Sequence, residues 1–99
     1  MRLEEFDWNH GNNEKIRKHG VKKQEVEDFF INGDPLIFAD QIHSATETRF
    51  FAFGKSNDRN IYVVFTFRAV DGRLKVRVIS ARFAHKKEAR KFYEKKSNN

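Results

Sequence analysis

The hydrophobic positions in the first third of the chain recur at helical spacing. Asn9 offers a side-chain oxygen for a helix N-cap, and the segment from there to Lys18 predicts a polar first helix. Gly20 closes this helix as the residue just beyond its C-terminus. From about Lys22 to Ile31 we expect a second helix, because three apolar residues there fall at i, i+3 and i+4: Val26, Phe29 and Phe30.

Beyond a turn at residues 32–35, the hydrophobic period changes from about 3.6 towards about 2. β-Branched and aromatic residues at this spacing are typical of strands. Asn, Asp and Gly in the connections at residues 56–60 and 70–73 favour hairpin turns. We therefore expect an antiparallel meander with strands at residues 36–39, 49–54, 61–68 and 74–81.

Alternation within the last two strands predicts which side chains share a face of the sheet. In the third strand, the odd positions from 61 to 67 are all apolar, whereas the even positions become polar towards Arg68. In the fourth strand, Lys75 and Arg77 share one face, and Ser80 is expected on the apolar face with Val76. The apolar faces then pack on the helices, and basic side chains collect on the opposite face.

A third helix is predicted over residues 86–96, with His85 as its cap and Glu88 three residues further on. One face of this helix carries cations and the other carries Ala89, Phe92 and Tyr93. Residues 95–99 are expected to form a flexible tail.

Two N-terminal helices, an antiparallel meander and a C-terminal helix predict one α+β domain spanning residues 1–99. Residues 2–8 alternate in part, which favours a short strand before the first helix. The chain has no cysteine, which excludes disulfides, thiolate zinc sites and a cysteine nucleophile. No apolar run approaches the roughly 20 residues of a membrane span, and the first residues lack a secretory apolar segment. We expect a cytoplasmic protein that does not bind membranes.

Charge is distributed unevenly between the two halves of the chain. Residues 1–48 carry 6 Lys/Arg against 10 Asp/Glu, whereas residues 49–99 carry 14 against 4. A balance of −4 therefore adjoins a balance of +10, which favours an anionic partner for the C-terminal half, with nucleic acid the first candidate. The alternative is a surface whose charge only aids solubility.

Several arginines of the predicted strands are candidates for binding phosphate. A guanidinium bonds phosphate oxygens bidentately and keeps its charge near neutral pH. Antiparallel pairing can bring several of them within reach of one phosphate: Arg49, Arg68, Arg77 and Arg82. Further contacts to RNA are expected from the last helix, through Lys86, Lys87 and Tyr93, although the Tyr93 ring can instead pack into the core. Each arginine can alternatively be a solvated strand position or a partner of an N-terminal acid.

The segment between residues 40 and 49 contains groups suited to proton transfer beside a phosphate: Asp40, His43, Glu47 and Arg49. This is loop spacing, and a loop histidine beside an aspartate often serves only as a hydrogen-bonding residue. The four histidines show no helical i, i+4 pair and no ligand triad, so we expect neither a metal site nor a cofactor.

Taken in order, these segments resemble the BrnT family of type II toxins over nearly the whole chain. The most specific matches are Lys18-His19-Gly20-Val21 and Arg77-Val78-Ile79-Ser80-Ala81-Arg82. The others are Phe6-Asp7-Trp8, Asn12, Lys15, residues 25–30, Asp40, His43, Glu47, Arg49, Gly54, residues 63–68, Ala84, Glu88 and Tyr93.

The resemblance implies a RelE/ParE-like fold, with helices on one side of an antiparallel sheet and a basic face on the other. It also implies a ribonuclease that cleaves mRNA by attack of a ribose 2′-OH, and a DNA-binding antitoxin whose complex represses its own operon. On the matching positions, Arg68 and Arg82 are candidates for phosphate stabilisation. His43 and Glu47 are candidates for proton transfer, and Arg49 for orientation.

Two positions depart from the family pattern. Asn9 stands where the family commonly has Asp, and Phe83 stands where a polar residue or Pro is frequent. Asn9 can still cap a helix, whereas Phe83 can stack on a base or pack. The alternative function is a non-catalytic module of the same fold that binds nucleic acid or protein.

Overall fold

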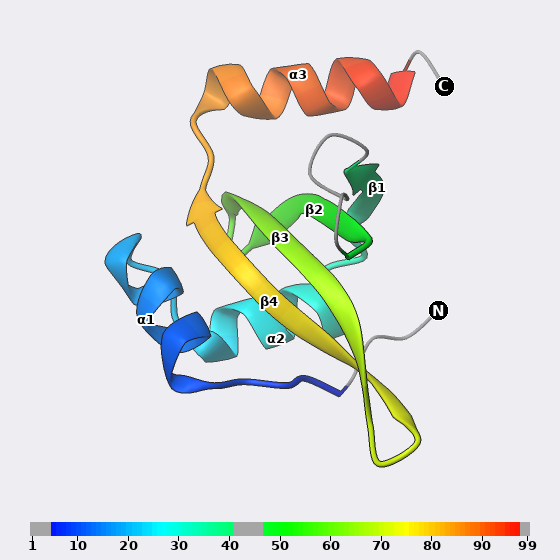
Figure 1. Cartoon of the computed structure of the whole chain (residues 1–99). Coiled ribbons are helices and arrows are strands. Elements are labelled where there is room, and N and C mark those ends of the chain that lie inside the picture. The colour runs from blue at the N-terminus through cyan, green and yellow to red at the C-terminus, as the bar shows by residue number, and fades with distance from the viewer. Residues whose placement is uncertain (1–4, 41–46, 98–99) are drawn as a thin grey trace.

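A computed structural model of the chain describes residues 5–40 and 47–97, with α1 at His10–Lys18 and α2 at Lys23–Asn32 (Figure 1). The predicted cap is confirmed, because the Asn9 side chain accepts a hydrogen bond of 2.9 Å from the Asn12 N–H. Gly20 ends α1 with a φ of 75°, a left-handed conformation that glycine adopts without steric cost.

The stripe predicted for the second helix is buried in the structure. Val26 and Phe29 are fully inaccessible to solvent, and Phe30 is nearly so. The Phe29 ring also explains why residue 54 is a glycine, since a Cβ atom at that position would lie only 3.0 Å from the ring. This close approach lets α2 lie directly against the sheet.

The sheet is the expected meander, with its strands in the order β1-β2-β3-β4 and every neighbouring pair antiparallel. The strands run over Leu36–Asp40, Arg49–Ser56, Arg59–Val70 and Arg73–Phe83. Apolar residues of β2, β3 and β4 form one core with α1 and α2, and its strand members include Ala52, Ile61, Val63, Phe65, Val76, Val78 and Ala81.

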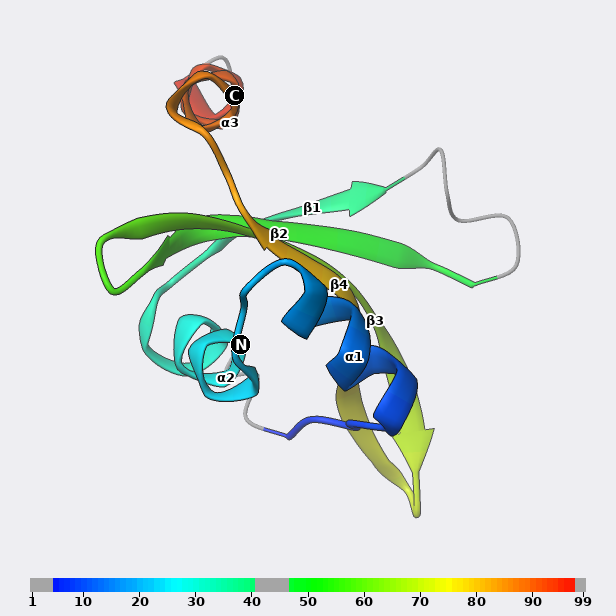
Figure 2. The same cartoon turned by 90° about the vertical axis from the view of Figure 1, so that its left-hand side faces the viewer.

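The third helix, α3 at Lys86–Ser97, lies on the opposite side of the sheet from α1 and α2 (Figure 2). Its Tyr93 ring contacts the Phe53 ring edge-on, with centroids 5.6 Å apart. The expectation that all helices lie on one side is therefore wrong. α3 ends at Ser97, one residue beyond the predicted end of the helix at residue 96.

An irregularity between β3 and β4 changes the faces predicted for β4. Val64 pairs with Ser80 but Phe65 pairs with Val78, so Ile79 lies between two pairs as a bulge. Ser80 consequently shares the face of Val64, and its predicted place on the apolar face is wrong.

The N-terminal segment runs beside the free edge of β4. A short strand is expected at residues 2–8. Among the described residues of this segment, the structure has instead a single parallel bridge between Phe6 and Val76. Two backbone hydrogen bonds of 2.8 Å hold it, one from Asp7 to Val76 and one from Val76 to Glu5. None of the helices within residues 5–40 and 47–97 is long and apolar enough to cross a membrane.

Candidate nucleic-acid interface

The strand register places the chemistry-bearing side chains on the outer face, which is the face of the sheet turned away from α1 and α2. Tyr62 on β3 lies opposite Arg82 on β4, and further along the same strands Thr66 lies opposite Arg77. Arg68 follows, opposite Lys75. The outer face therefore has two ends of different composition, which lie successively along β3.

We call one of them the basic end, and it consists of Arg49, Thr66, Arg68, Lys75 and Arg77. The register of β2 against β3 pairs Phe50 with Phe65, and one further step places Arg49 opposite Thr66. Neighbouring strands lie about 4.8 Å apart, so the Cα atoms of Arg49 and Arg77 are about 10 Å apart on either side of Thr66. Two long side chains at that separation can bind the same phosphate.

Thr66 fixes the middle of the basic end. It is 5% exposed, and its hydroxyl donates a 2.6 Å hydrogen bond to the carbonyl oxygen of Thr48. This bond ties β3 to the residue that precedes Arg49, so it fixes the backbone from which that guanidinium extends.

Glu47 lies beside Arg49, with its carboxylate 3.3 Å from both the Nε and an Nη atom of the guanidinium. Both side chains are about one-third exposed, at 33% for Arg49 and 39% for Glu47. Asp40 pairs with Arg49 across β1 and β2. His43, the other candidate for proton transfer, lies outside the described residues.

Arg68 and its neighbours form the more exposed part of the basic end. Arg68 lies 3.6 Å from the Asp7 carboxylate, and Arg73, at the tip of the same hairpin, lies 2.9 Å from Glu5. The arginine side chains are 53% and 72% exposed. Exposed pairs of this kind contribute little to stability, so both guanidiniums are available to an anionic ligand.

We call the other end the aromatic end, and it consists of Phe38, Phe51, Phe53, Tyr62 and Arg82. Arg82 donates two hydrogen bonds, of 2.9 and 2.7 Å, to the two carboxylate oxygens of Glu88 in α3. Its guanidinium also lies over the Tyr62 ring, 5.1 Å from the centroid. Unlike Arg68, Arg82 is held by a bidentate partner.

These contacts shift the pKa values of ionisable groups at the aromatic end. The hydrogen bonds from Arg82 lower the pKa of the Glu88 carboxyl from 4.5 to about 2. Burial raises the pKa of the Tyr62 phenol, and the negative charge of Asp40 adds to this effect. All three groups of this cluster therefore keep one protonation state through the physiological pH range.

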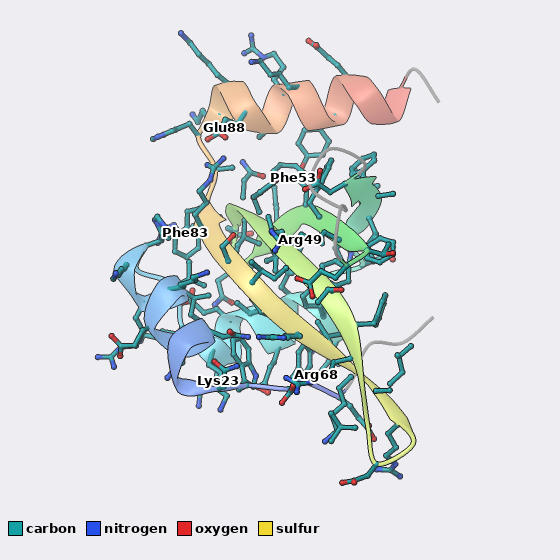
Figure 3. The ribbon with its side chains drawn as sticks, viewed as in Figure 1. Lys23, Arg49, Phe53, Arg68, Phe83 and Glu88 are labelled. Carbon is teal, nitrogen blue, oxygen red and sulfur yellow. The ribbon has the colours of Figure 1, made fainter. Side chains whose placement is uncertain are left out.

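The two arginines assigned to phosphate stabilisation lie at opposite ends of the outer face. Arg82 pairs with Tyr62, and Arg68 lies six positions after Tyr62 along β3. At about 3.3 Å per residue, this amounts to about 20 Å. Arg68 and Arg82 are thus too far apart to bind one phosphate, whereas Arg49 and Arg77 lie on either side of Thr66. Figure 3 shows this separation, because it labels Arg68 and also Glu88, which is the partner of Arg82.

The remaining candidates lie on α3 or on the opposite side of the sheet. Lys86 and Lys87 are exposed at the start of α3, and Tyr93 is 44% exposed. Phe83 pairs with Ile61 and packs against the core, with the Arg59 guanidinium 3.4 Å over its ring. Phe83 therefore packs and does not belong to the outer face.

Phosphate binding with proton transfer at Glu47 is the chemistry that these groups can support. Within residues 5–40 and 47–97, no group of three or more His, Asp or Glu is arranged to hold a metal ion. A model of a protein family described as the ribonuclease toxin BrnT, of a type II toxin–antitoxin system, matches residues 8–88.

The chain belongs to this family. The family identified from the sequence is thereby confirmed, and the chain is a ribonuclease toxin with RNA as its substrate and an antitoxin as its partner. The matched residues include α1, α2, the four strands and the start of α3. None of the curated proteins compared with the chain matches it.

The structure adds residues that the sequence did not single out for this BrnT toxin. In the sequence Thr66 is only a polar strand position, because its hydrogen bond to Thr48 joins residues that are 18 positions apart. Phe51 and Tyr62 belong to no motif of the sequence. Alternation with their buried neighbours is a local signal that could have placed both on the outer face.

Proposed function

We propose that the basic end is the active site of this toxin and that it cleaves mRNA without a metal ion. The proposal rests on one observation above all. Arg77 lies opposite Thr66, Arg49 is one step beyond the Phe50–Phe65 pair on the other side of Thr66, and Arg68 is one outward position further along β3. Three guanidiniums around one position form a site for a phosphodiester and for the charge that develops on it during cleavage.

In this mechanism the ribose 2′-oxygen attacks the adjacent phosphorus and gives its proton to a base. A bond forms between O2′ and phosphorus, the bond from phosphorus to the 5′-oxygen breaks, and that oxygen takes up a proton. The products are a 2′,3′-cyclic phosphate and a 5′-hydroxyl. Glu47 is a candidate base because its carboxylate lies 3.3 Å from Arg49, and His43 is the second candidate for proton transfer.

Arg49 orients the substrate, and Arg68 and Arg77 bind its phosphates. Arg82, held by Glu88, contributes through a neighbouring nucleotide. Lys86, Lys87 and Tyr93 extend the RNA contact onto α3, because all three are exposed there.

The wider biology follows from the family. We infer a RelE/ParE-like arrangement of the sheet, inhibition of translation by cleavage of mRNA in the cytoplasm, and neutralisation by a dimeric DNA-binding antitoxin. The complex of toxin and antitoxin represses its own operon through operator DNA. An acidic segment of the antitoxin would compete with RNA for the basic end.

The test is cleavage of an RNA oligonucleotide by the purified toxin, with and without EDTA. We expect a 2′,3′-cyclic phosphate product at an undiminished rate in EDTA. Arg49→Ala and His43→Ala are expected to lower the rate by about a hundredfold or more. Arg17→Ala is the matched control, since Arg17 lies on α1 in an exposed pair with Glu14.

Two outcomes would contradict the proposal. Cleavage that requires a divalent ion would exclude the metal-independent mechanism. RNA binding without cleavage, with or without divalent ions, would instead favour the non-catalytic module of the same fold.

A further inference from the structure

Three aromatic side chains form a strip across the outer face, directly beside the basic end. The Phe38 and Phe51 rings lie 5.2 Å apart at 30°, and the Phe51 and Tyr62 rings lie 5.6 Å apart at 27°. All three residues are half-buried. The strip is separate from the core formed with α1 and α2, because it lies on the opposite face of the sheet.

Arginines flank this aromatic strip on two sides, one on β2 and one on β4. Arg49 is the next outward position after Phe51 on β2, about 7 Å along the strand. On the side of β4, the Arg82 guanidinium lies 5.1 Å over the Tyr62 ring. Aromatic rings beside the arginines of the basic end fit single-stranded RNA, because a base can stack on aromatic rings while the neighbouring phosphate binds Arg49.

A base that is paired within a duplex is already stacked on both sides and cannot present its face to a protein ring. The outer face is also part of a four-stranded antiparallel sheet, an architecture whose aromatic residues stack RNA bases in RNA-recognition motifs. Both points favour a single strand over a duplex as the occupant of the strip.

We propose that Phe38, Phe51 and Tyr62 form a base-binding subsite for single-stranded RNA, adjacent to the phosphate bound at the basic end. Arg82 stays bonded to Glu88 and packs over Tyr62, so it borders the subsite on the side of β4. This inference rests on the proposed function, to which it adds the strandedness of the substrate and a place for one nucleobase.

The experiment measures binding of a 2′-O-methyl RNA oligonucleotide, which has no free 2′-hydroxyl and is not cleaved. Phe51→Leu and Tyr62→Leu keep an apolar side chain but remove the ring, and we expect binding to weaken between about fivefold and a hundredfold. Tyr62→Phe keeps the ring and is expected to bind like the unsubstituted protein. Leu74→Ala is the matched control, because Leu74 is apolar, 61% exposed and outside the strip.

A second measurement identifies the base. In a series of oligonucleotides with one abasic position each, one position is expected to bind as weakly as the Phe51→Leu variant binds the intact strand. Phe51→Leu should cause no further loss with that oligonucleotide, because the two changes remove the same contact. Duplex RNA of the same sequence should bind more weakly than the single strand.

Several results would overturn the inference. They are unchanged binding by both leucine variants, independent losses from the abasic position and from Phe51→Leu, or tighter binding of duplex RNA. If the unsubstituted toxin cleaves RNA in these cases, the proposed function stands and only the base subsite fails. If it neither binds nor cleaves RNA, both fail. Circular dichroism of each variant establishes that it is folded.

Discussion

The two ends of the outer face use the same residue type for different purposes. At the aromatic end, Arg82 has both of its terminal nitrogens bonded to Glu88 and packs over a ring. At the basic end, Arg68 makes one pair of 3.6 Å with Asp7. The first arginine joins α3 to the sheet, whereas the second keeps its hydrogen-bonding capacity for a ligand.

The difference shows that an arginine's role depends on how its donors are satisfied within the fold. A guanidinium with a bidentate carboxylate partner gains little from binding a phosphate, because that partner must first be displaced. Arginines held by weaker pairs bind phosphate at a lower cost. This is why we place the active site at the basic end, although the family resemblance assigned phosphate stabilisation to both Arg68 and Arg82.

The largest expected effect is the difference between substituting an arginine at the basic end and substituting one at the aromatic end. Arg77→Ala should lower kcat/KM for RNA cleavage by about a hundredfold with an unchanged Tm, because it removes transition-state stabilisation. Arg82→Ala should lower the Tm by about 4–8 °C, equivalent to about 1 kcal/mol, and reduce cleavage less than tenfold. Cleavage rates and thermal melts of both variants test this. Loss of activity without loss of stability in Arg82→Ala would reverse the roles of the two ends.

A smaller effect is expected from pH at the aromatic end. The folded state lowers the pKa of Glu88 from 4.5 to about 2, so its stabilising contribution is present above about pH 4.5 and is lost as the pH falls towards 2. Because Arg82 and Glu88 are 41% and 32% exposed, we expect a contribution of about 1 kcal/mol.

Urea unfolding at pH 7 and pH 3 measures that contribution. Glu88→Gln should be less stable than the unsubstituted toxin at pH 7 and should lose less stability on acidification. Glu14→Gln is the control, because its pair with Arg17 is more exposed, at 47% and 69%. Equal pH dependence in the unsubstituted toxin and in Glu88→Gln would show that the ion pair contributes nothing.

The smallest expected effect is on RNA affinity, from substituting Asp7, which pairs with Arg68 at the basic end. Asp7→Asn removes a carboxylate that competes with phosphate for Arg68, so RNA affinity should rise about two- to fivefold. The dependence of affinity on salt should become steeper, since one more cation releases counterions from RNA. Titrations at two salt concentrations measure both effects. An equal gain in Glu14→Gln, on α1, would mean that net charge alone is responsible.

Much of the fold could be predicted because its signals are local. The Asn9 cap, the stripe of Val26, Phe29 and Phe30, and the order of the four strands each depend on neighbouring residues, and each is confirmed. The first and third helices also begin close to their predicted starts. Of the candidate site, the sequence identified the residue types and the face but not their grouping.

The sequence alone determined a basic α+β domain, its alternating strands and its family. Tertiary structure decided which of its arginines lie close together. The bulge at Ile79 breaks the alternation and turns Ser80 and Arg82 to the outer face, and strand pairing puts Arg49 and Arg77 beside Thr66 while placing Arg82 about 20 Å from Arg68. The physical reason is that register and bulges arise from contacts between strands, which the local pattern of one strand does not encode.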